Sequence, residues 1–165
     1  MHSNIHHEQM EELPLWYSQI KKTMDFWPLA YYPFYMRPTE WGLKVEDRYE
    51  DQLTNADWEQ IREFANKVNK EGYPMFMGYE WQGAGLDGDH NVFFLNNDGE
   101  QRHPMRYQEL AAGFKGQPVI GIPHHLAYQP GSRGKNWETH DPEFSPFAEI
   151  YSSHGCSEND YGPLT

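Results

Sequence analysis

The stretch Pro118-Val-Ile-Gly-Ile-Pro-His-His-Leu-Ala-Tyr-Gln-Pro-Gly131 carries the strongest structural signal in the chain. A short apolar run ends abruptly in two adjacent histidines, His124 and His125, and a turn-rich segment follows them. This pattern is typical of a buried strand that delivers ligating side chains at its carboxyl end. We therefore expect a strand over 119–122 with a polar site at its end.

Two further stretches repeat the pattern. In Pro74-Met-Phe-Met-Gly-Tyr-Glu80 a strand-like run ends at a carboxylate, and in Phe147-Ala-Glu-Ile-Tyr-Ser-Ser-His154 one ends at a histidine. Because sites in parallel sheets and barrels lie at the carboxyl ends of the strands, these side chains should share one rim. His90 precedes its expected strand, so it would reach that rim only if this strand runs antiparallel.

The rest of the chain predicts helices that alternate with strands. Amphipathic spacing predicts helices over 13–23, from a capping box at Thr54–Asp57 to Gly72, and over 107–114. Further strands are expected over 25–31, 75–79 and 91–95, with an aromatic- and proline-rich loop before Leu53. This alternation favours an α/β fold with a largely parallel sheet or barrel, in a single domain over 1–165.

Composition limits the classes of partner. A net charge of -12 argues against binding to a nucleic-acid backbone, although bound cations could reverse the sign locally for a small anionic substrate. Cys156 is the only cysteine, which favours a reducing compartment such as the cytoplasm. No apolar run approaches the roughly 20 residues of a membrane helix. Aromatic residues make up 16% of the chain, a content that is compatible with a buried surface between subunits of an oligomer.

Histidines and a carboxylate at strand ends favour metal chemistry. Imidazole and carboxylate are usual ligands of zinc, iron and manganese, and a bound metal lowers the pKa of water from about 15.7 to about 7. Adjacent residues of an extended chain point in different directions, so one of His124 and His125 should ligate while the other orients it or contacts substrate. Two alternatives remain: a non-catalytic ligand-binding domain, and a closed metal site for storage or structure.

Five blocks of the sequence resemble the PHP (polymerase and histidinol phosphatase) superfamily, most closely a poorly characterised PHP-like branch. The blocks are Met1-His2-Ser-Asn4, Gly78-Tyr-Glu80-Trp81, Gly88-Asp-His90-Asn-Val-Phe-Phe94, Ile122-Pro-His-His125, and Glu149-Ile-Tyr-Ser-Ser-His-Gly155 with Ser157-Glu158. The resemblance implies a distorted (β/α) barrel with a metal cluster at the strand ends. It also implies hydrolysis of phosphoesters, and hence a small phosphorylated substrate.

The resemblance assigns roles to particular residues. The metal ligands that it implies, for one to three ions of zinc, manganese or iron, are His2, His6 or His7, Glu80 as a bridging carboxylate, His90 and His124. Glu80 would also be catalytic, and His125 and His154 would serve as proton donor or substrate contact.

The chain also departs from the family pattern. Asn4 occupies the second histidine position of the opening motif, and the second motif is replaced by Leu29-Ala-Tyr-Tyr-Pro33, which has no ligand. The closing motif would lie beyond Thr165, so we expect a fragment that lacks the C-terminal part of the barrel. These departures predict a depleted cluster, or a non-catalytic domain that retains the fold.

Overall fold

The structure is a computed structural model that describes residues 2–83 and 85–158. The chain divides into two compact units, residues 1–79 and residues 80–165. The first unit contains parallel strands and one antiparallel hairpin, and the second unit contains antiparallel pairs, so the fold is mixed α/β as the sequence predicts. The described residues form no closed barrel, and a PHP-like barrel stays a prediction. None of their helices is both long enough and apolar enough to cross a membrane.

Three parallel strands organise the first unit. They are β1 (Ser3–His6), β2 (Trp27–Tyr32) and β5 (Met75–Trp81). Ala30 in the middle strand stands opposite Asn4 on one side and Gly78 on the other. The strands are rich in buried apolar side chains, as expected for a sheet covered on both faces. The last two residues of β5, Glu80 and Trp81, already belong to the second unit.

The helices of the first unit are α1 (Leu13–Ile20), which follows a 3-10 helix (His7–Glu12), and α2 (Asp51–Lys70). One face of α2 is buried through Trp58, Ile61, Ala65 and Val68. The helix begins at Asp51, so the predicted start at a capping box over Thr54–Asp57 is wrong. Asp57 lies inside the helix instead, where it accepts hydrogen bonds from Tyr31 and His7.

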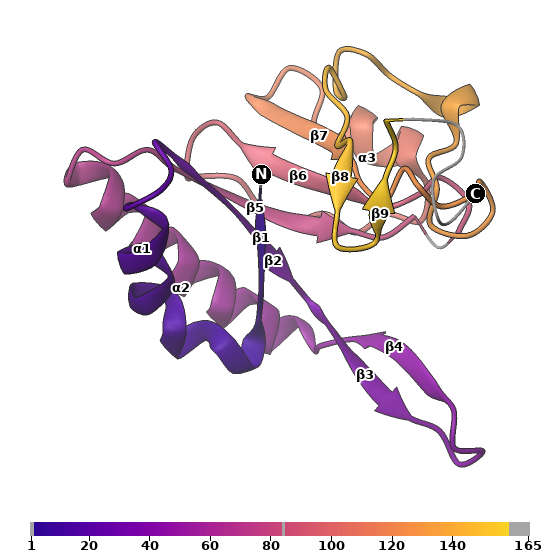
Figure 1. The fold of residues 1–165 in the computed structure, drawn as a ribbon, viewed down its shortest axis with the longest axis horizontal. Coiled ribbons are helices and arrows are strands. Elements are labelled where there is room, and N and C mark those ends of the chain that lie inside the picture. The colour runs from indigo at the N-terminus through magenta and orange to yellow at the C-terminus, as the bar shows by residue number, and fades with distance from the viewer. Residues whose placement is uncertain (1, 84, 159–165) are drawn as a thin grey trace. The chain divides into compact units, whose positions relative to one another are not determined.

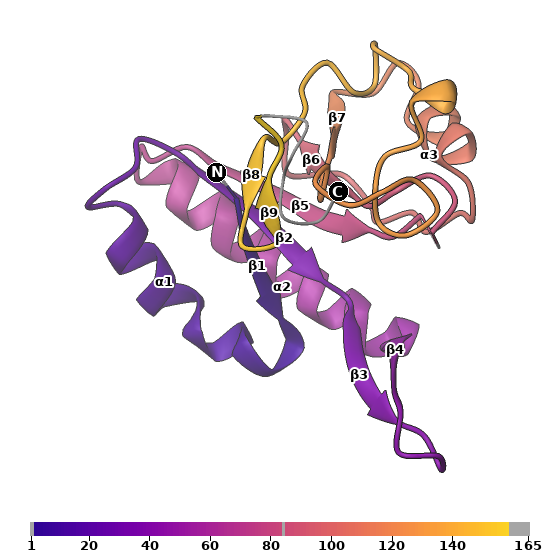
Figure 2. The same cartoon turned by 45° about the vertical axis from the view of Figure 1, so that its right-hand side comes forward.

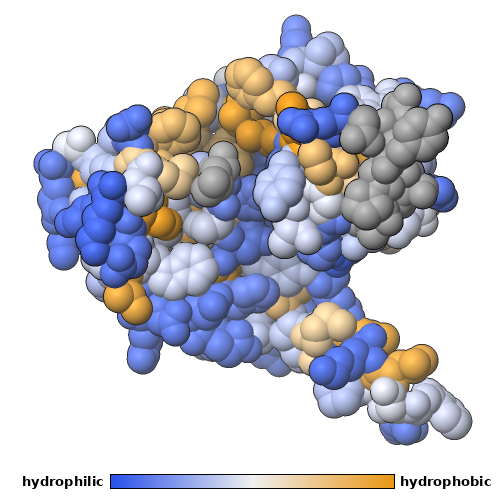
Figure 3. All heavy atoms as spheres, in the orientation of Figure 1, coloured by the Kyte–Doolittle hydropathy of each residue, from blue (hydrophilic) through white to orange (hydrophobic). Residues whose placement is uncertain are grey.

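A β-hairpin occupies the segment for which the sequence predicts a loop. Strands β3 (Phe34–Pro38) and β4 (Lys44–Arg48) pair antiparallel around a turn in which Gly42 takes a φ of 74°. The hairpin projects away from α1 and α2 (Figures 1 and 2). Its apolar side chains are exposed (Figure 3): Met36, Trp41, Leu43 and Val45. The prediction fails because it gave the prolines, which usually interrupt strands, more weight than the aromatics, which favour them; Pro38 is tolerated because β3 belongs to an exposed two-stranded hairpin.

The second unit contains an antiparallel pair and a short helix. They are β6 (His90–Phe94), β7 (Val119–Pro123) and α3 (Tyr107–Gly113). The segment that contains Phe144 and Glu149 then runs beside β7. Two backbone hydrogen bonds hold it there: the Gly121 N–H donates to the Phe144 carbonyl (2.8 Å), and the Glu149 N–H donates to the Pro123 carbonyl (3.1 Å). Gly121 permits this approach, since a Cβ there would lie 2.4 Å from the Phe144 ring.

The strand predicted over 147–153 is wrong. Residues 146–150 have no regular structure, and a small hairpin of β8 (Tyr151–Ser152) and β9 (Gly155–Cys156) follows them. His154 therefore lies in the turn of a hairpin rather than at the end of a buried strand. The apolar pattern misleads here because Phe147, Ile150 and Tyr151 are exposed.

Candidate functional site

Glu80, His124 and His125 come together in the second unit. Each offers one ligand atom, and these atoms all lie within 4.8 Å of one another. All three residues are buried. Glu80 is the penultimate residue of β5, and the two histidines follow β7 directly. The structure therefore brings together the side chains of two of the three predicted strand ends.

Backbone and carboxylate contacts fix the orientation of His124. Its N–H donates to the Asp89 carbonyl (2.8 Å), and its Nδ1 lies 2.8 Å from Oε2 of Glu149. A carboxylate only accepts hydrogen bonds, so Nδ1 carries the hydrogen and a neutral ring keeps its lone pair on Nε2. A carboxylate behind the ring is the usual support of a metal-ligating histidine. Glu149, which belongs to the last of the PHP-like blocks, takes this position.

An unusual backbone conformation brings His125 beside His124. His125 has a φ of 58°, in the left-handed region that residues other than glycine seldom adopt and that is common at functional sites. The two ring centroids lie only 3.4 Å apart. The rings lie side by side because the chain is not extended here, and the division of roles between a ligating and an orienting or substrate-contacting histidine stays a prediction.

The His125 ring is held neutral. Burial, and then the neighbouring His124 and His154 rings, lower the pKa of His125 to about 2. Its Nε2 lies 3.9 Å from Oε1 of Glu80, and its Nδ1 has no hydrogen-bond partner among the described residues. A neutral imidazole has a lone pair available for a metal at neutral pH.

His154 and Tyr128 flank this group. The His154 ring lies 4.3 Å from the His125 ring, centroid to centroid, and its Nδ1 lies 3.1 Å from the Tyr128 hydroxyl. The backbone N–H of Tyr128 donates to the His125 carbonyl (3.0 Å), which holds the tyrosine in the turn after the histidines. Sequence reasoning missed Tyr128, although its position three residues after His125 in a turn-rich segment was a usable signal.

His90 lies outside the group of three. Its strand pairs antiparallel with β7, with His90 opposite Pro123, which is the orientation that the sequence analysis set as the condition for reaching the rim. The side chain is fully buried against the rings of Tyr107 (4.7 Å) and Trp81 (5.7 Å). Its Nδ1 donates to the Gly88 carbonyl (3.0 Å). His90 thus has a set of partners distinct from the predicted ligands Glu80 and His124.

The other predicted ligands lie in the first unit. His2 precedes β1 and is partly buried. The His6 ring lies against Tyr32 (4.8 Å), whereas the His7 Nδ1 lies 2.9 Å from Asp57. Adjacent His6 and His7 thus contact different partners. Their role as metal ligands stays a prediction.

The group of three suits a transition metal. Two imidazoles and one carboxylate form a ligand set of catalytic zinc sites, which keep one coordination position open. Ligand bonds of about 2.1 Å allow two donor atoms to lie at most about 4.2 Å apart. The 3.9 Å between His125 Nε2 and Glu80 Oε1 is within this limit. The donor atoms therefore fit a single divalent cation with small side-chain adjustments.

His90 should make stability depend on pH. Burial, and to a lesser degree the charge of Lys135, lower the pKa of His90 to about 3. In the unfolded chain a histidine takes up a proton near pH 6.5, so the unfolded state binds more protons below that pH and native stability falls. His90→Phe retains a stacked ring but no titrating group. Between pH 6 and pH 5 the unsubstituted protein should lose about 1.4 kcal/mol more per pH unit than this variant in urea unfolding. Equal slopes would contradict the burial of a neutral His90.

Comparison with protein-family models, with curated proteins and with solved structures finds no match to this chain. The assignment of the PHP-like blocks to that superfamily therefore stays a prediction. The function proposed below rests on the geometry of Glu80, His124, His125 and the side chains around them.

Proposed function

We propose that this chain is a metal-dependent hydrolase that holds a divalent transition metal between Glu80, His124 and His125. The observation that carries the proposal is the convergence of three buried ligand atoms within 4.8 Å of one another. Glu149 behind His124 supports it, because such a carboxylate fixes the ring and increases its basicity as a ligand. A bound cation would acidify a coordinated water molecule and so supply a nucleophile at neutral pH.

The remaining residues suit the handling of protons. His154 lies against His125 and is exposed, so its ring can reach a substrate that enters from solvent. Tyr128 holds His154 through Nδ1, which leaves Nε2 for a proton that passes to the leaving group. His154 is therefore the proposed general acid and Tyr128 the residue that positions it.

A phosphoester is the proposed substrate class. The PHP-like blocks favour it, and so does the charge balance of the chain. With a net charge of -12, the protein would attract an anionic group only where a bound cation reverses the local sign. A small phosphorylated compound fits this better than a nucleic acid, whose backbone needs a broad basic surface.

The supporting carboxylate gives a test of metal binding. Glu149→Gln should weaken zinc affinity 10–100-fold, because a neutral amide orients His124 less firmly. Glu143→Gln makes the same change at an exposed position of the same segment and should leave affinity unchanged. Zinc titration by calorimetry, with elemental analysis of the dialysed proteins, measures both. The proposed site would be contradicted if the unsubstituted protein bound no zinc. It would also be contradicted if Glu149→Gln, like Glu143→Gln, bound zinc with the affinity of the unsubstituted protein.

The effect of His154 on kcat should depend on whether the leaving group of the substrate needs a proton. For phenyl phosphate, whose leaving group needs protonation, His154→Gln should lower kcat by about 100-fold. For 4-nitrophenyl phosphate, whose leaving group departs as the anion, the loss should be small. His103→Gln, at a histidine that contacts Gln101, is the control. Equal losses on both esters would exclude the proton-donor role, and metal binding without turnover of either would favour the non-catalytic ligand-binding alternative.

A further inference from the structure

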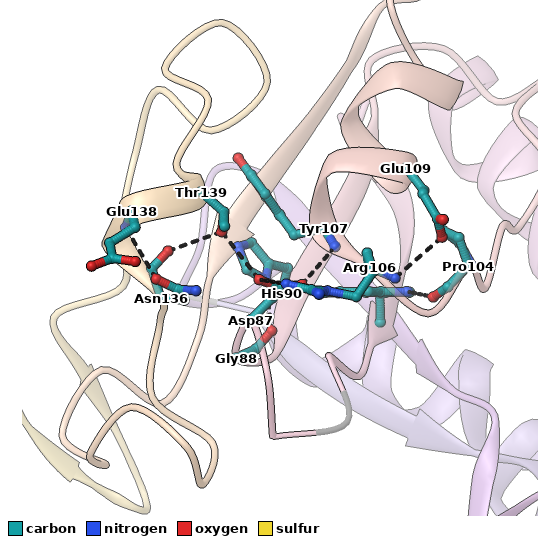
Figure 4. Close-up of polar contacts among 11 residues, drawn as sticks. Asp87, Gly88, His90, Pro104, Arg106, Tyr107, Glu109, Asn136, Glu138 and Thr139 are labelled. Atoms are coloured by element: carbon teal, nitrogen blue, oxygen red, sulfur yellow. Dashed lines mark hydrogen bonds and ion pairs between the residues drawn. The ribbon is translucent and has the colours of Figure 1, made fainter.

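A second polar cluster of the second unit is centred on Asp87, which is fully buried. Figure 4 shows Arg106, Tyr107 and Thr139 directed at its carboxylate. Oδ2 accepts from Arg106 Nε (2.8 Å) and from the Tyr107 N–H (3.0 Å), and Oδ1 accepts from Arg106 Nη2 (3.3 Å) and Thr139 Oγ1 (3.1 Å). Burial raises the pKa of Asp87, but these donors outweigh it and hold the pKa below its usual value. Asp87 is thus an anion whose hydrogen-bonding capacity is fully used.

Lys135 lies in this cluster without a hydrogen-bond partner. Its side chain is 2% exposed, and its Nζ lies 3.4 Å from the centre of the Tyr107 ring. No described residue accepts a hydrogen bond from Nζ. A ring face attracts a cation but does not replace the hydrogen bonds that an amine makes in water, so this burial is costly unless a ligand joins the site.

His90 presents a second unused polar atom at the same ring. Because its Nδ1 donates to the Gly88 carbonyl, its Nε2 carries a lone pair. That atom is buried and has no partner among the described residues. His90 stacks on Tyr107, the ring that Lys135 Nζ also contacts, and the charge of Lys135 lowers the pKa of His90, so the two side chains interact electrostatically. One nitrogen donates and the other accepts, which suits a neutral molecule with both an acceptor and a hydroxyl.

The backbone holds Lys135 firmly in place. A Cβ on Gly88, which has a φ of 77°, would lie 2.8 Å from the Lys135 Cα and 2.7 Å from the Gly134 carbonyl. A Cβ on Gly134 would lie 2.1 Å from the Tyr128 carbonyl. Only glycines permit these approaches, so the loop of Lys135 packs directly on the loop of Asp87. On the surface side, Thr139 and His140 are only partly buried, which gives the cluster an edge near solvent.

The electrostatics favour a reactive amine. Burial lowers the pKa of Lys135 to about 8, against the attraction of Asp87. A buried lysine of this kind is a good nucleophile because a sizeable fraction carries a free lone pair near neutral pH. The guanidinium of Arg106 is already paired with Asp87, so it is engaged and does not serve to hold a carboxylate or phosphate. The ligand should therefore be uncharged.

We propose that Lys135 is a nucleophilic amine that forms an imine with a small uncharged hydroxy-aldehyde or hydroxy-ketone. The amine nitrogen bonds to the carbonyl carbon while the C–O π pair moves to oxygen, and one proton passes from nitrogen to that oxygen. The C–O bond then breaks, the second amine proton leaves with the oxygen as water, and a C=N bond remains. His90 Nε2 acts as a positioning group that accepts a hydrogen bond from the ligand hydroxyl.

Reductive trapping of the unsubstituted protein tests this site. The folded chain is treated briefly with glycolaldehyde and cyanoborohydride at pH 7.5, and the label on each lysine is measured by peptide mass spectrometry. Lys115 is exposed and serves as the internal control. Lys135 should be labelled at least tenfold faster than Lys115. The labelling of Lys135 should level off above pH 8 to 9, whereas ordinary lysines, with a pKa of about 10.4, become steadily more reactive.

Two further measurements test whether the reactivity of Lys135 comes from its folded environment and whether the ligand hydroxyl contributes to it. In urea the labelling ratio should fall to about one, because the environment of Lys135 is lost. Propionaldehyde, which has no hydroxyl group, should label folded Lys135 more slowly than glycolaldehyde does. A folded Lys135 that is unlabelled, or labelled no faster than Lys115, would overturn the proposal and leave a lysine that only packs on Tyr107. Equal rates with the two aldehydes would overturn the role of His90.

Discussion

The second unit depends on the turn that follows β7. There the left-handed backbone of His125 places two consecutive imidazoles side by side, against a carboxylate that is buried at the end of β5. Burial keeps His125 neutral, so this ring brings no positive charge to Glu80. A left-handed histidine and a buried acid are each unfavourable. A divalent cation that binds all three side chains would offset both costs, which is why this turn is the centre of the functional account.

The elements that the sequence predicts well are those with a strong period and a clear end. The helix that contains Trp58 and Ile61, the strands that end near Glu80 and His124, and the short helix from Tyr107 all form close to their expected bounds. Their apolar residues are buried, so pattern and packing agree. The exposed hairpin of β3 and β4 and the irregular segment before β8 were predicted wrongly, because there apolar side chains lie at the surface.

The candidate site was only partly predictable from the sequence, because local patterns do not encode contacts between distant segments. Residue type and position after a strand identify Glu80, His124 and His125. The pairing of His124 with Glu149, and of His154 with Tyr128, depends on how the chain returns along β7, which no local pattern encodes. His90 shows the limit most clearly. Its strand is antiparallel to β7, the condition set for His90 to reach the rim, yet its ring packs on Tyr107 and its Nδ1 donates to the Gly88 carbonyl.

The two polar clusters of the second unit have opposite electrostatic character. Around Glu80 a carboxylate faces the imidazole rings of His124 and His125, an arrangement that suits a cation. Around Asp87 the carboxylate is saturated by donors, and the unused groups are an amine and a lone pair, which suit an uncharged ligand. The two clusters lie close together in the sequence, but they suit different ligands.

Anomalous X-ray scattering from crystals of the zinc-loaded protein tests the central claim most directly. We expect one strong peak at the zinc edge within bonding distance of Glu80, His124 and His125, with Glu149 behind His124 and a coordination position open to solvent. A peak held by other side chains, or crystals grown with zinc that show no peak between these three residues, would contradict it.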